Sequence, residues 1–213
     1  MAAFMMELTR SRLVAIIRGT DRDAAAAAAL VLFEEGISCV EIALTTPGAL
    51  EAIEKIRRQL PDGAWVGAGT VLTAADAMDA AAAGAQFVVT PGVTESISAA
   101  AGLGLPVLAG AFTATEAMDA MSRGASAVKL FPASAAGPGY LSALRGPLPS
   151  IPFIAVGGVG LADAPGFFRA GAVALGLGSP LVGDAATPAG NLASLRTRAR
   201  QFIQVVVDEA AAR

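Results

Sequence analysis

The chain repeats one local pattern along most of its length: an alanine-rich, helix-favouring segment ends at a glycine, and an apolar run begins shortly afterwards. Glycine tolerates the left-handed conformation in which helices commonly end. The six glycines that close such segments are Gly36, Gly63, Gly84, Gly104, Gly124 and Gly171. The pattern therefore predicts helices and strands in alternation.

The spacing of these glycines gives the number of units. Successive ones are 20 to 27 residues apart, the length of one strand plus one helix, except for a doubled interval after Gly124. One apolar run lies in that interval and another precedes the first unit. The eight predicted strands are Leu13–Ile17, Cys39–Leu44, Trp65–Thr70, Phe87–Thr90, Val107–Ala109, Ala127–Phe131, Phe153–Val156 and Val173–Leu177.

The continuous apolar runs of these predicted strands are typical of strands covered on both faces. Eight such units predict a (β/α)8 barrel with a short N-terminal helix; a doubly wound open sheet is the alternative.

Composition limits the organisation and the chemistry. The chain has 213 residues, 54% of them hydrophobic, and no linker or low-complexity segment, so we expect one α/β domain over residues 1–213. Histidine is absent and Cys39 is the sole cysteine, which argues against His-based metal sites, Ser-His-Asp triads and disulfide frameworks. With a net charge of −3 and no strong basic cluster, we expect no nucleic-acid partner.

Two segments bear on localisation. The N-terminus carries Glu7 and lacks a basic region followed by an apolar run, so it does not resemble a secretory signal, and we expect the cytoplasm. The span Ser96–Thr115 is uncharged and long enough to cross a membrane, but glycines and Pro106 interrupt it. We therefore expect a helix end, a turn and a strand there, and no membrane span.

The two lysines of the chain have contrasting surroundings. Lys55 lies in the mixed-charge stretch Glu51–Arg58, which is typical of a solvated helix face, whereas Lys129 lies in the apolar run Ala125–Pro132, which predicts a buried strand. Burial lowers the pKa of a lysine from about 10.4 toward neutrality, and a neutral lysine is a nucleophile. The alternative is a buried stem whose charged head reaches water.

Glu41 is a second charged residue inside an apolar run, in the middle of the second predicted strand. Glu41 and Lys129 could form a structural ion pair, which would be weak evidence for stability. We favour catalysis, in which the lysine attacks a ketone to form a carbinolamine and then an iminium while the carboxylate moves protons. Other polar residues expected at the carboxyl ends of the strands, where barrel active sites lie, are Arg18, Thr45, Thr70, Thr90 and Thr113.

Glycine clusters follow the last two predicted strands. Gly157-Gly158 follows the seventh, before a helix expected from about Ala162, and Gly178-Ser179 follows the eighth. Loops in these positions, with exposed backbone N–H groups and a short helix N-terminus, form a recurrent phosphate site in such barrels. The pairing of two clusters favours a phosphate site over simple turn formation.

Six short motifs occur in an order and spacing that resemble one enzyme family. They are Arg18-Gly19, Val40-Glu41-Ile42, Gly67–Val71, Val89–Gly92, Val128–Pro132 and Val156–Val159. Together they resemble the class I 2-keto-3-deoxy-6-phosphogluconate and 2-keto-3-deoxy-6-phosphogalactonate aldolases, over about Leu13 to Leu181. The resemblance implies cleavage of a phosphorylated keto-deoxy sugar acid to pyruvate and glyceraldehyde 3-phosphate, in carbohydrate metabolism of the Entner-Doudoroff type.

The same resemblance implies roles for residues. Lys129 would form the Schiff base and Glu41 would be the general acid and base. Residues implied at the carboxylate and pyruvyl end are Arg18, Thr45, Thr70, Pro91 and Phe131; those implied at the phosphate are Gly157, Gly158, Gly178 and Ser179. The resemblance also implies a homotrimer, with no cofactor and no metal because the iminium replaces a Lewis acid.

One departure distinguishes the two branches of the family. Gluconate-type members carry an arginine four residues after the glutamate, where this chain has Thr45; Arg18 stands at the end of the first strand instead, as in galactonate-type members. We therefore expect the galactonate derivative to be cleaved at least as well as its C4 epimer. Two other functions fit the barrel and the phosphate loops: a metal-independent sugar-phosphate isomerase or epimerase with Glu41 as base, and a non-catalytic phosphometabolite-binding barrel.

Overall fold

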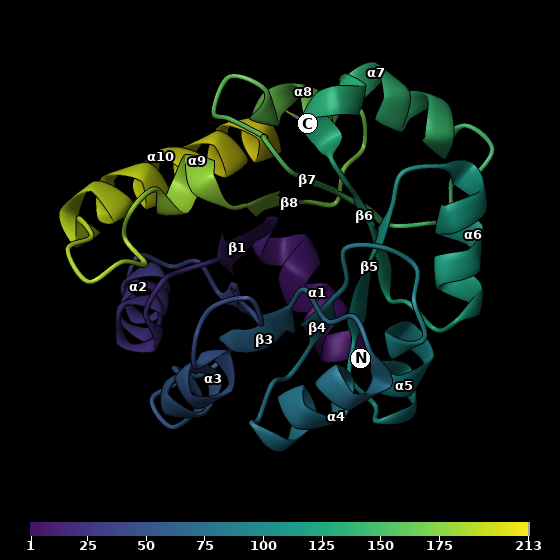
Figure 1. Cartoon of the computed structure of the whole chain (residues 1–213). Coiled ribbons are helices and arrows are strands. Elements are labelled where there is room, and N and C mark those ends of the chain that lie inside the picture. The colour runs from purple at the N-terminus through teal and green to yellow at the C-terminus, as the bar shows by residue number, and fades with distance from the viewer. Residues whose placement is uncertain (213) are drawn as a thin grey trace.

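Eight parallel strands close into a barrel in the computed structural model, which describes residues 1–212 (Figure 1). The strands pair in sequence order and the ring closes between β1 and β8. Their bounds are β1 Leu13–Ile17, β2 Cys39–Ala43, β3 Trp65–Gly69, β4 Val88–Val89, β5 Val107–Ala111, β6 Ala127–Leu130, β7 Phe153–Val156 and β8 Ala174–Leu177. The predicted (β/α)8 barrel is confirmed, and the open-sheet alternative is wrong.

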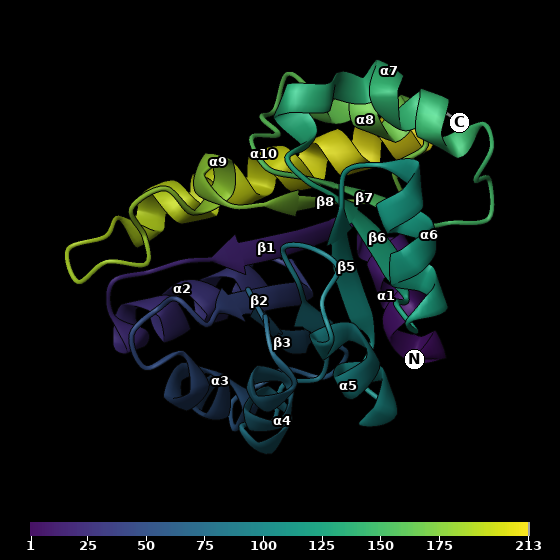
Figure 2. The same ribbon diagram turned by 45° about the vertical axis from the view of Figure 1, so that its right-hand side comes forward.

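Apart from the N-terminal helix, the helices surround this barrel as an outer layer, as the two views show (Figures 1 and 2). Their bounds are α1 Ala2–Ser11, α2 Arg22–Glu34, α3 Ala49–Arg57, α4 Ala74–Ala82, α5 Ser96–Gly102, α6 Ala114–Ser122, α7 Ala133–Arg145, α8 Ala164–Arg169, α9 Ser179–Val182 and α10 Leu192–Ala211. All six closing glycines have positive φ angles, between 77° and 99°. Five of them stand two residues after a helix and use the left-handed conformation that favours glycine, whereas Gly63 lies in the turn between α3 and β3.

The N-terminal helix α1 covers the amino ends of the strands. Its Phe4 is fully buried, stacks on Phe87 with ring centroids 4.6 Å apart, and meets Trp65 edge-on at 5.2 Å. Trp65 begins β3 and Phe87 directly precedes β4, so these rings close the lower end of the barrel. Burying such an aromatic side chain stabilises the fold by about 1.5 to 3 kcal/mol. The site must therefore lie at the opposite, carboxyl end.

The predictions for Lys55, for the span Ser96–Thr115 and for the helix near Ala162 agree with the structure. Lys55 lies on an exposed helix face and pairs with Asp23 at 2.8 Å. The uncharged span Ser96–Thr115 folds as α5, a turn and β5. Within residues 1–212 no helix combines the length and apolarity needed to cross a bilayer. The helix expected from about Ala162 begins two residues later, at Ala164.

Candidate active site

A cavity of about 430 Å³ opens at the carboxyl ends of the strands. It is lined by Ile16, Arg18, Glu41, Thr70, Pro91, Lys129, Phe131, Val156, Gly157, Gly158, Gly178, Ser179, Pro180, Val182 and Gly183. Its volume lies within the range of small-molecule sites. Ten of the eleven residues predicted for the site therefore lie in one cavity.

Glu41 and Lys129 reach this cavity from opposite sides of the barrel. Glu41 is on β2 and Lys129 on β6, four places apart in the ring of eight strands. Both are buried, with 2% and 8% of their surface exposed. Alternate residues of a barrel strand face inward, so each charge lies one layer above an apolar interior residue of its own strand, Cys39 or Ala127.

Burial shifts the pKa values of both groups toward neutrality. It raises the pKa of Glu41 to about 7, against the opposing attraction of Lys129 and Arg18. It lowers the pKa of Lys129; Glu41 opposes that change and Arg18 adds a further lowering. The raised pKa of Glu41 suits it to proton exchange near neutral pH, and the lowered pKa of Lys129 favours its neutral, nucleophilic amine.

No hydrogen bond or ion pair joins Glu41 to Lys129 among those formed within residues 1–212. The Glu41 Oε2 atom is buried without a hydrogen-bond partner. The Lys129 Nζ atom lies 4.9 Å from the centre of the Phe131 ring, within the range of a cation–π contact. The arrangement therefore offers no support for a static ion pair, and it leaves both groups able to meet a third molecule.

Arg18 and Thr70 lie together at the ends of β1 and β3. The Arg18 Nη2 atom donates a long hydrogen bond of 3.4 Å to Thr70 Oγ1. Thr70 has a φ of 58°, a left-handed conformation that is uncommon for a threonine and is found disproportionately at functional sites. A guanidinium in this position can hold a carboxylate with two parallel hydrogen bonds.

The two glycine loops follow β7 and β8 and also line the cavity. Gly157 and Gly158 have φ angles of 95° and 74°. A side chain at either would also collide with a neighbour, because an ideal Cβ would lie 2.8 Å from the Phe131 ring or 2.5 Å from Ser134 Oγ. Gly178 precedes the short helix α9, which Ser179 begins. The loops thus bring backbone N–H groups and one hydroxyl to the cavity, as an anion site requires.

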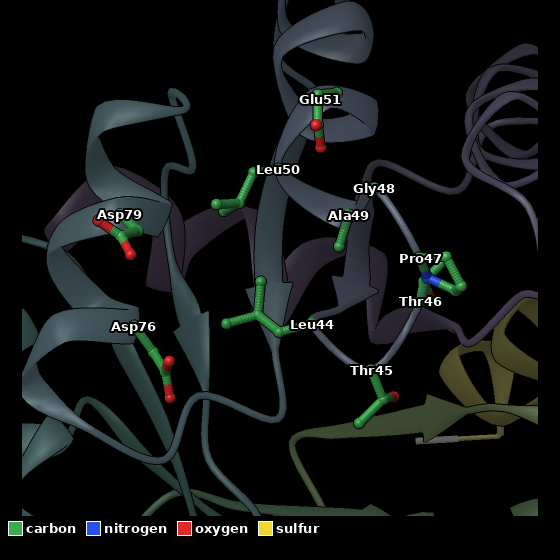
Figure 3. Close-up of a pocket in the computed structure, with 10 residues that line it drawn as sticks. All are labelled: Leu44, Thr45, Thr46, Pro47, Gly48, Ala49, Leu50, Glu51, Asp76 and Asp79. Atoms are coloured by element: carbon green, nitrogen blue, oxygen red, sulfur yellow. The ribbon is translucent and has the colours of Figure 1, made fainter.

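Thr45 is the predicted site residue that the structure does not bring together with the others. It lines a separate cleft of about 430 Å³ between the β2–α3 loop and α4, with Asp76 and Asp79 on the far wall (Figure 3). The strand ends at Ala43, and the turn that follows breaks the inward alternation that Glu41 shares. The role implied for Thr45 at the carboxylate and pyruvyl end therefore has no support in this geometry.

Some cavity residues were not predicted from the sequence. Ile16 and Val156 occupy inward positions of β1 and β7 that a period-two reading of those strands would have found. Pro180, Val182 and Gly183 belong to α9 and its end, a four-residue helix too short for a sequence pattern.

Two threonines at strand ends have structural roles. Thr90 donates a hydrogen bond to the Gly92 carbonyl at 2.7 Å and thereby shapes the loop around Pro91. Thr113 begins α6 in a capping box with Glu116.

The fold and the site together define a (β/α)8 enzyme with a buried lysine and a carboxyl group of pKa about 7 in one cavity, beside two glycine loops. Residues 5–197 match the family model of the KDPG and KHG aldolases. The chain belongs to this family, and it is accordingly an aldolase, a carbon–carbon lyase.

Individual relatives agree with that assignment. The 2-dehydro-3-deoxy-6-phosphogalactonate aldolase of Escherichia coli K12 is 42% identical over 81% of this chain and 85% of its own length. A native KDPGal structure has a TM-score of 0.87 at 36% identity, covering 93% of this chain and 96% of the other. The KDPG aldolase of Legionella pneumophila, with pyruvate captured as a covalent carbinolamine, has a TM-score of 0.81 at 28% identity, covering 95% and 97%.

Proposed function

We propose that this aldolase cleaves 2-keto-3-deoxy-6-phosphogalactonate and its gluconate epimer to pyruvate and glyceraldehyde 3-phosphate through a Schiff base on Lys129. The observation that carries the proposal is the buried Lys129 amine, whose pKa is lowered, in the same cavity as Glu41. The pyruvate carbinolamine captured in the Legionella relative supports it.

The chemistry follows from the two shifted groups. The neutral Lys129 amine attacks C2 of the keto acid, and loss of water from the carbinolamine gives the iminium. Ionised Glu41, directly or through one water, takes the C4 hydroxyl proton; the C3–C4 bond then breaks, and its electron pair moves to the iminium to form an enamine. Glyceraldehyde 3-phosphate leaves, the enamine C3 takes back a proton, and water releases pyruvate from the lysine.

Arg18 and Thr70 are suited to the substrate carboxylate, and Pro91 and Phe131 to the apolar sides of the pyruvyl group. A charge-assisted, bidentate contact to Arg18 would fix the keto acid relative to the amine. Because the positive charge of Arg18 also lowers the pKa of Lys129, the same residue favours the nucleophilic form.

Gly157, Gly158, Gly178 and Ser179 are suited to the phosphate at the far end of the substrate. Their backbone N–H groups and the Ser179 hydroxyl provide hydrogen-bond donors for a phosphate. We prefer the aldolase function to an isomerase or epimerase function because the latter would leave Lys129 without a role.

The galactonate preference rests on Arg18 at the end of β1 and on the galactonate-type relatives. Thr45 lies outside the cavity and does not enter this proposal. From the composition we propose that residues 1–213 form one domain, and from the family resemblance that the chain assembles as a homotrimer. We also propose that it works in the cytoplasm.

Pyruvate release from the two pure epimers tests the proposal. We expect both to be cleaved, with kcat/KM for the galactonate form at least equal to that for the gluconate form. A tenfold preference for the gluconate form, roughly 1.4 kcal/mol of transition-state free energy, would contradict the galactonate assignment alone. Release of no pyruvate from either epimer would contradict the substrate assignment as a whole.

A further inference from the structure

Strand β3 presents two glycines to the barrel interior, and they face different neighbours. Its inward positions are Trp65, Gly67 and Gly69. An ideal Cβ on Gly67 would lie 2.7 Å from the Phe87 ring, whereas one on Gly69 would lie 2.6 Å from Glu41 Oε1 and 2.8 Å from Glu41 Cδ. Real Cβ atoms essentially never approach other atoms this closely. The Glu41 carboxyl group therefore occupies the space that a side chain at position 69 would fill.

Backbone conformation does not require glycine at this position. The φ of Gly69 lies outside the positive range, and its carbonyl accepts a hydrogen bond from Leu44 N at 2.8 Å within the regular ladder between β2 and β3. An L-residue could adopt this extended conformation. Position 69 requires glycine because the Glu41 carboxyl group occupies the space that a Cβ atom would need.

Little else holds the carboxyl group of Glu41. Its Oε2 atom is buried without a hydrogen-bond partner, and no ion pair to it forms within the described residues. Packing against the bare Cα of Gly69 consequently sets the depth and direction of the carboxyl group. A methyl group there would push it away from β3 into the barrel, the space across which Lys129 approaches from β6.

We propose that Gly69 is a positioning residue for the aldolase reaction: its missing side chain seats the Glu41 carboxyl group against β3 and keeps it from closing onto Lys129. This inference rests on the proposed role of Glu41 in proton transfer. It adds a residue that is not among those lining the cavity and that acts through Glu41.

The test is a double-mutant cycle of Gly69→Ala and Glu41→Gln. We expect Gly69→Ala to lower kcat by about 100-fold, the lower end of what general acid–base catalysis usually contributes. KM should change by less than about threefold. We also expect the limb of its pH–rate profile near 7 to move. In the Glu41→Gln background the same change should cost less than about threefold, because residues that act through one another are not additive. An equal loss in both backgrounds, or an unaltered pH profile in Gly69→Ala, would overturn the inference.

A rescue variant covers the case in which Gly69→Ala folds poorly. Glu41→Asp shortens the side chain by one methylene, so Gly69→Ala/Glu41→Asp should have a higher Tm than Gly69→Ala and lose less activity than the product of the single losses. Gly67→Ala is the matched control, because its collision with Phe87 should lower Tm without moving the pH limb. A Tm no higher in the double variant than in Gly69→Ala would overturn the inference.

The two proposals fail separately. An unchanged kcat in Glu41→Gln would remove Glu41 from the mechanism, and the inference about Gly69 with it. A damaged Glu41→Gln with an additive Gly69→Ala would remove only Gly69.

Discussion

The two ends of the barrel interior are one layer of side chains apart, yet the amino end holds an inert thiol and the carboxyl end holds a group suited to proton transfer. Cys39 and Glu41 are two residues apart on β2, roughly 6.6 Å along the strand, and both are buried. Burial raises the pKa of the Cys39 thiol to about 12, so the thiol stays protonated and inert beside α1. The same cause raises the pKa of Glu41 to about 7, which suits it to proton transfer. Desolvation therefore keeps the thiol at the amino end of the barrel unreactive and makes the carboxyl group at the other end a suitable proton acceptor.

The largest expected effect comes from removing the amine of Lys129 at the carboxyl end of the barrel. Lys129→Arg should lose at least about 10,000-fold in kcat, because a guanidinium does not deprotonate at usable pH and cannot form the iminium. Lys55→Arg is the matched control: Lys55 is exposed in an ion pair with Asp23, and its replacement should leave the rate of pyruvate release within twofold of the original. Substantial turnover by Lys129→Arg would refute covalent catalysis.

Removing the carboxylate should have the next largest effect. Glu41→Gln should lower kcat by about 100- to 10,000-fold and leave the fold intact. Because Glu41 must be ionised to accept a proton and its pKa is about 7, kcat of the original protein should fall as pH drops below about 7. That limb should vanish in Glu41→Gln. A limb that persists in the variant would show that another group titrates.

A charge in the glycine loops should act on binding more than on chemistry. Gly158→Asp should raise KM for the phosphorylated substrate by about 10- to 150-fold, the scale of one lost hydrogen bond to a charged group. Its effect on KM for the unphosphorylated analogue should be small. Equal changes for the two substrates would mean that Gly158 only shapes the turn.

The smallest effect on activity is expected at the amino end of the barrel, which α1 covers. Phe4→Ala should lower the free energy of unfolding by about 3 to 5 kcal/mol, because it opens a cavity against Phe87 and Trp65. Its kcat at a temperature where the variant is folded should remain within about twofold. A loss of activity comparable with that of Glu41→Gln would contradict the separation of the two ends.

Much of this architecture could be predicted from the sequence because the constraints are local. The closing glycines and the apolar runs place all eight strands within one residue at their amino ends, and a charge inside an apolar run marks both Glu41 and Lys129. Contacts between strands have no such local signal. The displacement of Thr45 depends on a turn after β2, and the fit of Glu41 against Gly69 depends on the β2–β3 register.

The central claim is that Lys129 forms an iminium with the keto acid, and borohydride trapping tests it most directly. The protein is incubated with pyruvate and sodium borohydride, digested, and mapped by mass spectrometry. Reduction of an iminium should leave a stable pyruvyl-derived adduct on the peptide that carries Lys129 and abolish activity in parallel. An adduct on Lys55 instead, or full activity after treatment, would contradict the claim.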